Sequence, residues 1–354
     1  MSEKVIVKRE VLLDQCTKIF VAAGMRQDEA AVVADNLVAA DQTGMDSHGV
    51  MRVPAYTKRL RDGGTLPHSE IEVVRETPTT AVIDGHNGMG QVVSKFAMEK
   101  CIKKAKKCGV AFVAVRGSNH FGMASYFTRM ALEHNMIGMC STSPAAHLLA
   151  PTGGVEPILD NNPFSFAIPA GKEYPVVLDM ATSVVSRGKL ASAAKRGDKI
   201  PTTWAMTIDG EPTDDPKLGF DGILLPVGGY KGYGLTVISG VMAAMLSNAA
   251  LMSRDICDFY VDTDKEQNIG HLFGCIDIQV FCDVDDFKHR MDEMIDEIHN
   301  CRKAPGVDRI LLPGERSGRT ADKNAVEGIP LNETVFKDLN DVAVSYGLQP
   351  IQQG

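Results

Sequence analysis

Between residues 71 and 142 the chain alternates short apolar runs with amphipathic helical stretches, and this alternation constrains the fold more than any other feature. The expected strands are 71–74, 81–84, 110–115 and 136–140. The stretch beginning near Gln91, between the second and third strands, carries apolar residues in one i, i+4 row, as an amphipathic helix does. Such an order predicts an α/β sheet covered by helices. We expect the loop Arg116–Gly122 to follow the carboxyl end of a strand, a place where open α/β sheets bind ligands.

The rest of the chain extends this unit on both sides. Residues 8–43 carry the apolar periodicity of two helices, and a third is expected from Pro54 to about Leu60. Further strands are expected at 164–168, 176–179 and 272–280, and further helices at 182–195, 232–248, 285–301 and 332–345. We therefore predict an α/β fold with a mixed sheet and a helical N-terminal portion. The predicted divisions are a helical portion at 1–70 that packs with the C-terminal segment, an α/β unit at 71–144, an α/β domain at 145–310 and the C-terminal segment at 311–354.

The first candidate for chemistry is the segment Asp46-Ser47-His48-Gly49, which is followed by Arg52 and Tyr56. Histidine exchanges protons near neutral pH, with an unperturbed pKa of about 6.5, and arginine offers a fork of donors that matches a carboxylate. The spacing i, i+4, i+8 would put His48, Arg52 and Tyr56 on one face of a continuous helix. Because Pro54 interrupts the hydrogen bonding of such a helix, the segment is compatible both with a functional site and with a structural cluster.

The second candidate is Ser118-Asn119-His120-Phe121-Gly122, in the loop after the strand at 110–115. Glycines at 117 and 122 permit tight backbone turns, and the serine and asparagine can bond the backbone and hold the loop. Such a loop can fix an imidazole over a cleft, although a histidine that only stabilises a turn fits equally well. No pair of histidines has the spacing of a metal site, so no metal is predicted. The histidines expected at the surface are His68, His134, His289 and His299.

Composition excludes several classes of partner. The formal net charge of −8 argues against nucleic acid, whose binding relies on clustered lysine and arginine. The most apolar stretch, 235–251, contains four polar side chains and indicates a buried helix rather than a membrane span. Residues 1–10 are charged and lack the apolar stretch of a secretory signal. Eight cysteines without Cys-x-x-Cys spacing favour reduced thiols and a cytoplasmic location.

Signals for nucleotide binding are present only in unusual forms. The chain contains no Gly-x-Gly-x-x-Gly fingerprint, and neither of its Gly-Lys pairs is followed by serine or threonine, so the usual Rossmann and P-loop motifs are absent. The glycine-rich segment 228–234 lies at the start of an expected helix and includes Lys231 and Gly232, which makes it a plausible phosphate-binding site. Arg187-Gly188-Lys189 and Pro313-Gly314-Glu315 are weaker candidates. Each of these segments is also compatible with a plain packing turn.

Taken together, seven short segments resemble the malate/L-lactate dehydrogenase family, whose members lack the usual Rossmann domain. The resemblance spans nearly the whole chain, and the segments follow the order found in the family. They are Asp-Ser-His-Gly-Val-Met-Arg (46–52), Ser-Asn-His-Phe-Gly (118–122), Asn-Pro-Phe-Ser-Phe-Ala-Ile-Pro (162–169), Asp-Met-Ala-Thr-Ser (179–183), Arg-Gly-Lys (187–189), Lys-Gly-Tyr-Gly-Leu (231–235) and Leu-Pro-Gly-Glu (312–315). The chain departs from the family at Asp160-Asn161-Asn162-Pro163, where Gly-Thr-Asn-Pro is common.

The resemblance implies a non-Rossmann dehydrogenase fold, a homodimer, and NAD or NADP bound mainly by the domain at 145–310. It implies that His120 lies near the reacting carbon and that Ser47, His48 and Arg52 lie at a small anionic substrate. We expect Tyr56 at the substrate as well. The residues that the resemblance assigns to the cofactor are Thr142, Asn162, Asp179, Met180, Ala181, Arg187, Lys231, Gly232, Pro313, Gly314 and Glu315.

The predicted reaction is hydride transfer between NAD(P) and C2 of a small 2-hydroxy or 2-oxo acid of the malate or lactate type. No side chain accepts hydride, so the cofactor must do so, while His120 removes the hydroxyl proton and Arg52 holds the carboxylate. His48 is the alternative base, or a group that polarises the carbonyl. Within the family, ureidoglycolate dehydrogenase and cyclic imino-acid reductase are alternative activities. A hydrolase lacks support because no Gly-x-Ser-x-Gly elbow is present, and a nucleotide-binding protein without catalysis is the alternative from another class.

Overall fold

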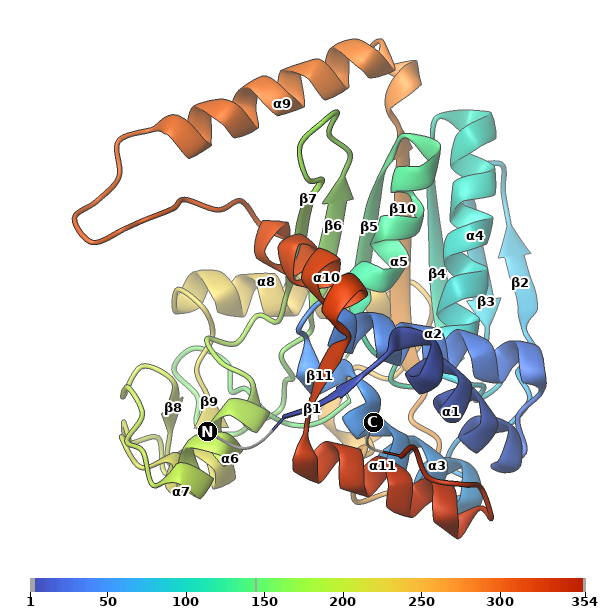
Figure 1. Cartoon of the computed structure of the whole chain (residues 1–354), viewed down its shortest axis with the longest axis vertical. Helices are drawn as coiled ribbons and strands as arrows, with labels where there is room; N and C mark the ends of the chain where they lie inside the picture. Colours follow the sequence, from blue (N-terminus) through green and yellow to red (C-terminus); the bar gives the residue numbers. More distant parts are fainter. Residues whose placement is uncertain (1–3, 144, 353–354) are drawn as a thin grey trace.

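The computed structural model describes residues 4–143 and 145–352, and its centre is a seven-stranded sheet (Figure 1). The strand order is β2-β3-β4-β10-β5-β6-β7, in which β3 and β4 are parallel and every other neighbouring pair is antiparallel. The mixed sheet predicted from the sequence is therefore confirmed. The strands are β2 (Glu72–Glu76), β3 (Thr80–Asp84), β4 (Val110–Ser118), β5 (Met136–Thr142), β6 (Phe164–Ile168), β7 (Val176–Met180) and β10 (Ile269–Asp277).

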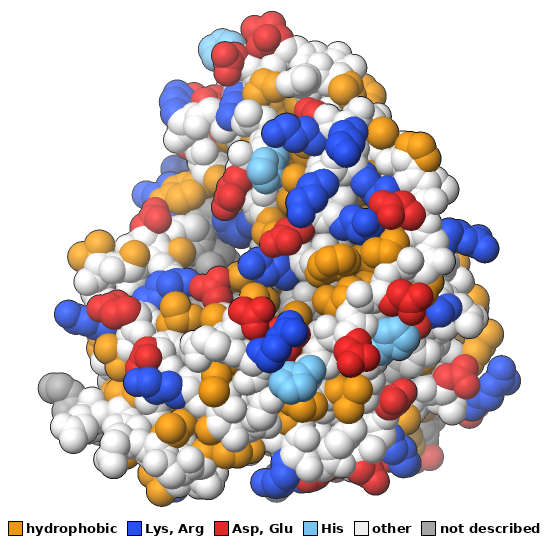
Figure 2. All heavy atoms as spheres, turned by 90° about the vertical axis from the view of Figure 1, so that its right-hand side faces the viewer, with side chains coloured by type: hydrophobic (Ala, Val, Ile, Leu, Met, Phe, Trp, Pro, Cys, Tyr) orange, Lys and Arg blue, Asp and Glu red, His pale blue; other side chains and the backbone are white. Residues whose placement is uncertain are grey.

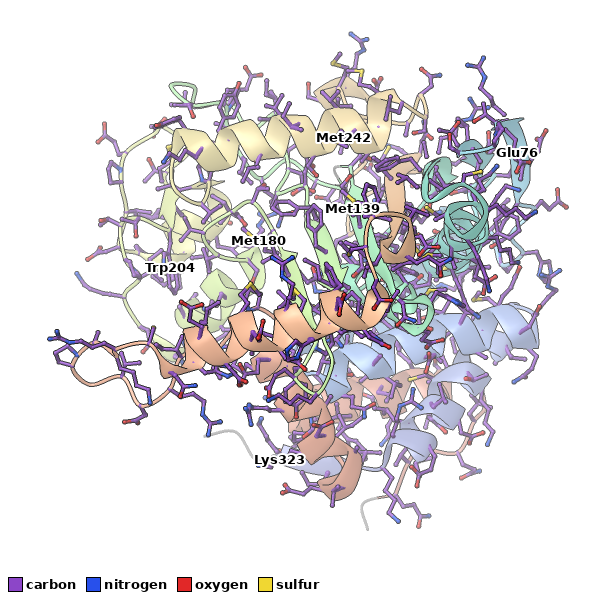
Figure 3. All side chains as sticks on the ribbon, turned by 90° about the horizontal axis from the view of Figure 1, so that it is seen from above. Glu76, Met139, Met180, Trp204, Met242 and Lys323 are labelled. Carbon is purple, nitrogen blue, oxygen red and sulfur yellow. The ribbon has the colours of Figure 1, made fainter. Side chains whose placement is uncertain are left out.

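Helices cover this sheet on both sides. Helix α4 (Gly90–Cys108) connects β3 to β4 in parallel, and together with α5 (Ala124–Met130) it buries a core that includes Phe127 and Phe273. Seen from above, α8 (Tyr230–Gly240) lies on one side of the sheet, and α10 (Glu315–Glu327) and the N-terminal helices lie on the other (Figure 3). Viewed from the side of β2 and α4, the molecule shows acidic and basic side chains mixed across its surface (Figure 2).

The two ends of the chain meet in a second structural unit. Strand β1 (Lys4–Val7) pairs antiparallel with β11 (Ile329–Asn332). Helices α1 (Arg9–Ala22), α2 (Gln27–Gln42), α3 (Val53–Asp62) and α11 (Glu333–Ser345) surround this pair. Their common core contains Phe20, Leu37 and Phe336, which come from opposite ends of the sequence. The C-terminal segment thus packs on the N-terminal helices, which hold the first histidine segment.

A smaller unit sits beside the sheet and has its own apolar core. It contains α6 (Arg187–Arg196), β8 (Ala205–Met206), α7 (Pro216–Asp221) and β9 (Ile223–Leu224). After β9, the chain leaves this unit through α8 and the five-residue π-helical stretch Val241–Met245. The chain then runs through β10 into α9 (Val284–Asn300), which extends along the top of the molecule in Figure 1. Within residues 4–143 and 145–352, no helix is long and apolar enough to cross a membrane.

Several expected boundaries need correction. The helix expected at 182–195 begins only at Arg187, because Thr182 donates its N–H to Asn161 O and Val184 donates to Leu225 O. The helix expected at 232–248 stops being α-helical after Gly240. The strand expected at 272–280 is displaced towards the N-terminus and ends at Asp277, whose carboxylate accepts from the N–H of Gln279 and begins a short turn.

Candidate active site

The first histidine segment is built from two separate 3₁₀ turns rather than one helix. Asp46–His48 and Val50–Arg52 form these turns with extended backbone at Gly49 between them, and α3 begins at Val53. The Val50 N–H donates to Asp41 Oδ2 over 2.7 Å. A Cβ atom on Gly49 would stand 1.9 Å from Asp41 Oδ1, so only glycine allows this close approach. The local order of the segment therefore comes from a carboxylate on α2.

Helix α2 also anchors the second histidine segment. Gly122 has a φ of +78°, and a Cβ atom there would stand 2.0 Å from Asn36 Oδ1. The Met123 N–H donates to the same amide oxygen over 3.3 Å. On the other side of the loop, Gly117 has a φ of +59°. One helix thus holds both loops, and this brings their histidines together.

The two imidazoles lie against each other beside a tyrosine. The ring centroids of His48 and His120 are 5.6 Å apart, with 18° between the ring planes. The Tyr56 hydroxyl lies 2.7 Å from His120 Nδ1, and the Ser47 hydroxyl lies 2.9 Å from His48 Nδ1. Each Nδ1 atom is therefore engaged, whereas the Nε2 atoms have no hydrogen-bond partner within the described chain. Both histidine residues are partly exposed.

Arg52 lies at the edge of this cluster. Its Nε donates to the Ser47 carbonyl oxygen over 2.7 Å, and its guanidinium lies 5.6 Å from the centroid of the Tyr260 ring. Phe259 closes the cluster, with its ring centroid 5.3 Å from that of His120 and 5.7 Å from that of Tyr56. Neither aromatic residue was expected at the site from the sequence. They belong to a segment without regular periodicity, and nothing in their immediate sequence distinguishes them from loop residues.

The environment keeps both histidines neutral near pH 7. Burial lowers the pKa of His48 to about 3, with a further contribution from the Arg52 charge. Burial and the same charge also hold the pKa of His120 well below its usual value. Burial raises the pKa of Tyr56 to about 12, so its hydroxyl is uncharged and can either donate or accept a hydrogen bond. A neutral imidazole can accept a proton at an unprotonated nitrogen, as a general base must.

A third histidine, which the sequence analysis also missed, supports the His120 loop from behind. His271 is fully buried and its ring stacks on Phe121 at 4.5 Å. Its Nδ1 lies 2.7 Å from the Thr142 hydroxyl, and its Nε2 lies 2.9 Å from the Ser118 hydroxyl. The hydroxyl of Thr142, which the sequence analysis assigned to the cofactor, therefore contacts this histidine. Burial lowers the pKa of His271 to about 3, so it remains neutral.

A cavity of about 500 Å³ is lined in part by residues that are close in sequence to both histidine segments. Thr43 and Met45, just before Ser47, line it together with Met123, just after Gly122. Its other lining residues include three of those assigned to the cofactor from the sequence, namely Asp179, Pro313 and Gly314. The Asp179 carboxylate accepts from the Ser125 N–H over 2.7 Å. A volume of this size is typical of a small-molecule or cofactor site.

The polar groups of this cavity fit a phosphate-containing cofactor. Helix α10 begins there without a side-chain cap, which leaves first-turn N–H groups for an anion. The Nε atom of Arg129, another lining residue, is buried and has no hydrogen-bond partner among the described residues. A buried donor without a partner is costly unless a ligand satisfies it. The residues present therefore fit a dinucleotide.

A second group of the assigned residues lies at the start of α8. The Asn162 side-chain amide donates to Thr236 O over 2.9 Å, and the Thr236 hydroxyl donates to Thr182 Oγ1 over 2.6 Å. These bonds tie the residues after Met180 and Ala181 to the helix that carries Lys231. Gly232 is required there, since a Cβ atom would stand 2.1 Å from Val227 O. Lys231 itself is exposed, whereas Met180, labelled in Figure 3, is half-buried.

Two of the assigned side chains are engaged elsewhere. The Arg187 guanidinium stacks on Phe220 at 4.4 Å, and its Nε donates to the carbonyl oxygen of the same residue. The Glu315 carboxylate is paired with His299 and Arg319, each at 2.7 Å. His299, expected at the surface, is half-buried by this contact. Among the residues that the structure describes, no three His, Cys, Asp or Glu side chains gather as metal ligands.

Comparison with known proteins identifies the group to which this arrangement is similar. The family model described as malate/L-lactate dehydrogenase matches residues 7–340. The malate dehydrogenase of Pyrococcus abyssi is 39% identical over 98% of this chain and 96% of that protein. The L-sulfolactate dehydrogenase of Methanocaldococcus jannaschii is 38% identical over 96% of each chain. The solved structure of malate dehydrogenase from Pyrococcus horikoshii superposes with a TM-score of 0.89 at 36% identity, over 99% of this chain and all of that one.

Proposed function

The chain belongs to the malate/L-lactate dehydrogenase family and is a 2-hydroxy acid dehydrogenase, and we propose that His120 is its general base. The observation that carries this assignment is the contact between the Tyr56 hydroxyl and His120 Nδ1 at 2.7 Å. When Nδ1 carries the proton, it donates to the tyrosine oxygen, and Nε2 is left with a free lone pair. That lone pair accepts the hydroxyl proton of the substrate during oxidation.

The same contact serves the reverse reaction. His120 in its protonated form donates from Nε2 to the oxygen of a 2-oxo acid, while Nδ1 continues to donate to Tyr56. The low pKa of His120 disfavours this form, because the ring is desolvated and faces the Arg52 charge. A substrate carboxylate that neutralises Arg52 removes part of this penalty. An anionic substrate therefore raises the pKa of His120 from its depressed value and makes the protonated form less unfavourable.

Arg52 binds the substrate carboxylate in this proposal. Its Nε is committed to the Ser47 carbonyl, which orients the guanidinium and leaves its terminal nitrogens free. Two parallel hydrogen bonds to the carboxylate would fix which face of C2 is presented for hydride transfer. Ser47 holds His48 Nδ1 and thereby positions the second imidazole against the first. His48 then polarises the substrate oxygen from its Nε2.

A nicotinamide dinucleotide, when bound, accepts or supplies the hydride. The residues that would hold it line the cavity described above, with Asp179, Pro313 and Gly314 along its wall. Lys231 and Gly232, at the start of α8, would hold a further part of it. Phe259 packs against the His120 ring and helps to exclude water from the reacting atoms.

We propose malate or sulfolactate as the substrate, because the relatives described above bear those names. The test is an initial-rate panel at 340 nm with 2-hydroxy acids and both nicotinamide cofactors. Malate, lactate, sulfolactate and ureidoglycolate are compared at equal concentration, together with a cyclic imino acid in the reducing direction. We expect the highest kcat/KM for an acid with a second anionic group. Absence of turnover with every 2-hydroxy acid would overturn the proposed function.

We also propose that the protein is a homodimer formed through α8. One side of this helix and the π-helical stretch after it exposes uncharged, mainly apolar side chains. These residues, which are 36–69% exposed, are Tyr230, Leu235, Ile238, Val241, Met242, Met245 and Leu246. A continuous apolar patch of this kind suits a self-complementary contact between two copies. Light scattering should give twice the chain mass of 38.2 kDa, and Ile238→Glu should give the monomer. A wild-type monomer at micromolar concentration would contradict this proposal.

The state of the cysteines supports a cytoplasmic location as part of the same proposal. All eight thiols are free, and Cys108, Cys282 and Cys301 are exposed. Exposed free thiols persist in a reducing compartment and oxidise outside it. Recovery of full activity without added thiol, after purification from an oxidising compartment, would contradict this location.

A further inference from the structure

We propose that Arg129 and Arg316 bind the 2′-phosphate of NADP(H), so that this enzyme prefers NADP(H) to NAD(H). The inference rests on the proposed function, since it assumes that the cavity lined by Asp179, Pro313 and Gly314 holds the dinucleotide. NADP differs from NAD only by one phosphate on the adenosine ribose. A preference between them requires cationic groups that the pyrophosphate does not occupy.

Arg129 is a cation without a partner. It stands in the last turn of α5, lines the cavity, and is only partly exposed. Its Nε atom is buried with no hydrogen bond, and within the described chain no carboxylate lies within 4 Å of its guanidinium. The nearest charge that acts on it is Asp179, whose carboxylate is already held by Ser125. A desolvated guanidinium of this kind is costly in the empty protein and favours an anionic ligand.

Arg316 provides a second cation on the same cavity. It stands in the first turn of α10 and is exposed. The acidic residue next to it, Glu315, cannot neutralise it, because both carboxylate oxygens are engaged by His299 and Arg319. No ion pair of Arg316 occurs within residues 4–143 and 145–352. The Glu315 contacts therefore keep Arg316 available.

The charges that line the cavity favour an additional phosphate. They are Arg129, Arg316 and Asp179, which is two positive groups against one negative group. The start of α10 supplies N–H groups suited to the pyrophosphate that both cofactors share. The two guanidiniums are then free for a phosphate that only NADP carries, and arginine binds phosphate through two parallel hydrogen bonds.

The competing assignment is that the same arginines bind the pyrophosphate. The two assignments predict different results with the two cofactors. Arginines on the pyrophosphate would affect NADPH and NADH equally, whereas arginines on the 2′-phosphate would affect NADPH alone. The ratio of the two dissociation constants therefore distinguishes them without any measurement of turnover.

The experiment is calorimetric titration of the substrate-free full chain with NADPH, NADH and 2′,5′-ADP. We expect NADPH to bind at least ten-fold more tightly than NADH. Arg316→Met and Arg129→Met should each weaken NADPH by about ten- to a hundred-fold, the range for a charged hydrogen bond. The same variants should change NADH by less than about two-fold. Arg196→Met, at an exposed position on α6, is the matched control and should change neither constant.

The outcomes separate the inference from the proposed function. If neither dinucleotide binds the wild-type chain, the proposed function itself is overturned. If NADH binds as tightly as NADPH, or if the Arg316 variant weakens both by the same factor, only the 2′-phosphate assignment is overturned. Arg316 is exposed and its variant is expected to fold, so the test does not depend on the stability of the Arg129 variant. Binding of 2′,5′-ADP that depends on both arginines would support the assignment directly.

Discussion

Replacing Tyr56 by phenylalanine removes the single hydroxyl that contacts the proposed base. The Tyr56 side chain is 2% exposed, and its ring packs edge-on against Phe259 at 5.7 Å. Phenylalanine preserves this packing, so the change isolates the 2.7 Å contact with His120 Nδ1. Without it, the imidazole loses the group that fixes its orientation and accepts the Nδ1 proton.

The size of the effect follows from the loss of one buried hydrogen bond. We expect the free energy of unfolding to fall by about 1 kcal/mol, the net value of such a bond. We expect kcat to fall by about ten- to a hundred-fold, which corresponds to about 1.4–2.7 kcal/mol of lost transition-state stabilisation. The KM for the cofactor should stay within about two-fold, since Tyr56 does not line the cavity that we assign to the cofactor. Initial rates at 340 nm and urea unfolding measure these quantities.

Tyr126→Phe is the matched control. The Tyr126 hydroxyl also donates a 2.7 Å hydrogen bond, but to Asp35 rather than to a histidine. This variant should lose similar stability and keep its kcat. A Tyr56 variant whose kcat stays within two-fold of wild type would refute the positioning role. Equal losses of kcat in the two variants would show that the effect is a general loss of stability.

Three further predictions concern the substrate clamp, the buried histidines and the loop glycine. Arg52→Met should lower kcat/KM for the acid by about a hundred-fold or more through loss of two charged hydrogen bonds. An unchanged KM would exclude Arg52 as the residue that binds the substrate carboxylate. His48 and His271 have pKa values near 3 in the folded chain, whereas the unfolded chain protonates them near pH 6.5. The free energy of unfolding should therefore fall as pH drops below 6.5, by up to about 1.4 kcal/mol per pH unit for each histidine. Urea unfolding at pH 7 and 5.5 tests this, and equal stability would contradict it. Gly49→Ala should cost about 1–3 kcal/mol, because its Cβ would meet the Asp41 carboxylate; a thermal melt like that of wild type would exclude this crowding.

The central sheet could be predicted from the sequence because most of its strands coincide with short runs of apolar residues. The strands expected at 110–115 and 164–168 appear as β4 and β6, with the second at the same residues. The pairing of β1 with β11 was not predictable. Each of these strands has four residues, and the partners are more than 300 residues apart in the sequence. Such short segments carry too little periodicity to be told from loops.

The chemistry of the candidate site could also be predicted from the sequence, whereas its spatial arrangement could not. The residue types of His48, Arg52 and His120 indicate proton transfer and anion binding. Their meeting depends on α2, whose side chains at 36 and 41 anchor both loops through glycines. The spacing within either segment contains no information about this shared anchor. Phe259 and His271 approach from distant parts of the chain, so only the tertiary structure brings them to the site.

The central claim is that His120 transfers the substrate proton while the cofactor supplies or accepts the hydride. Single-turnover oxidation of the best acid, followed at 340 nm in wild type and His120→Asn, tests it most directly. We expect the hydride-transfer rate to fall by about 10²- to 10⁴-fold, the usual contribution of a general base. The cofactor dissociation constant, measured by calorimetry on the same preparations, should remain within two-fold. A variant that transfers hydride at close to the wild-type rate would contradict the account.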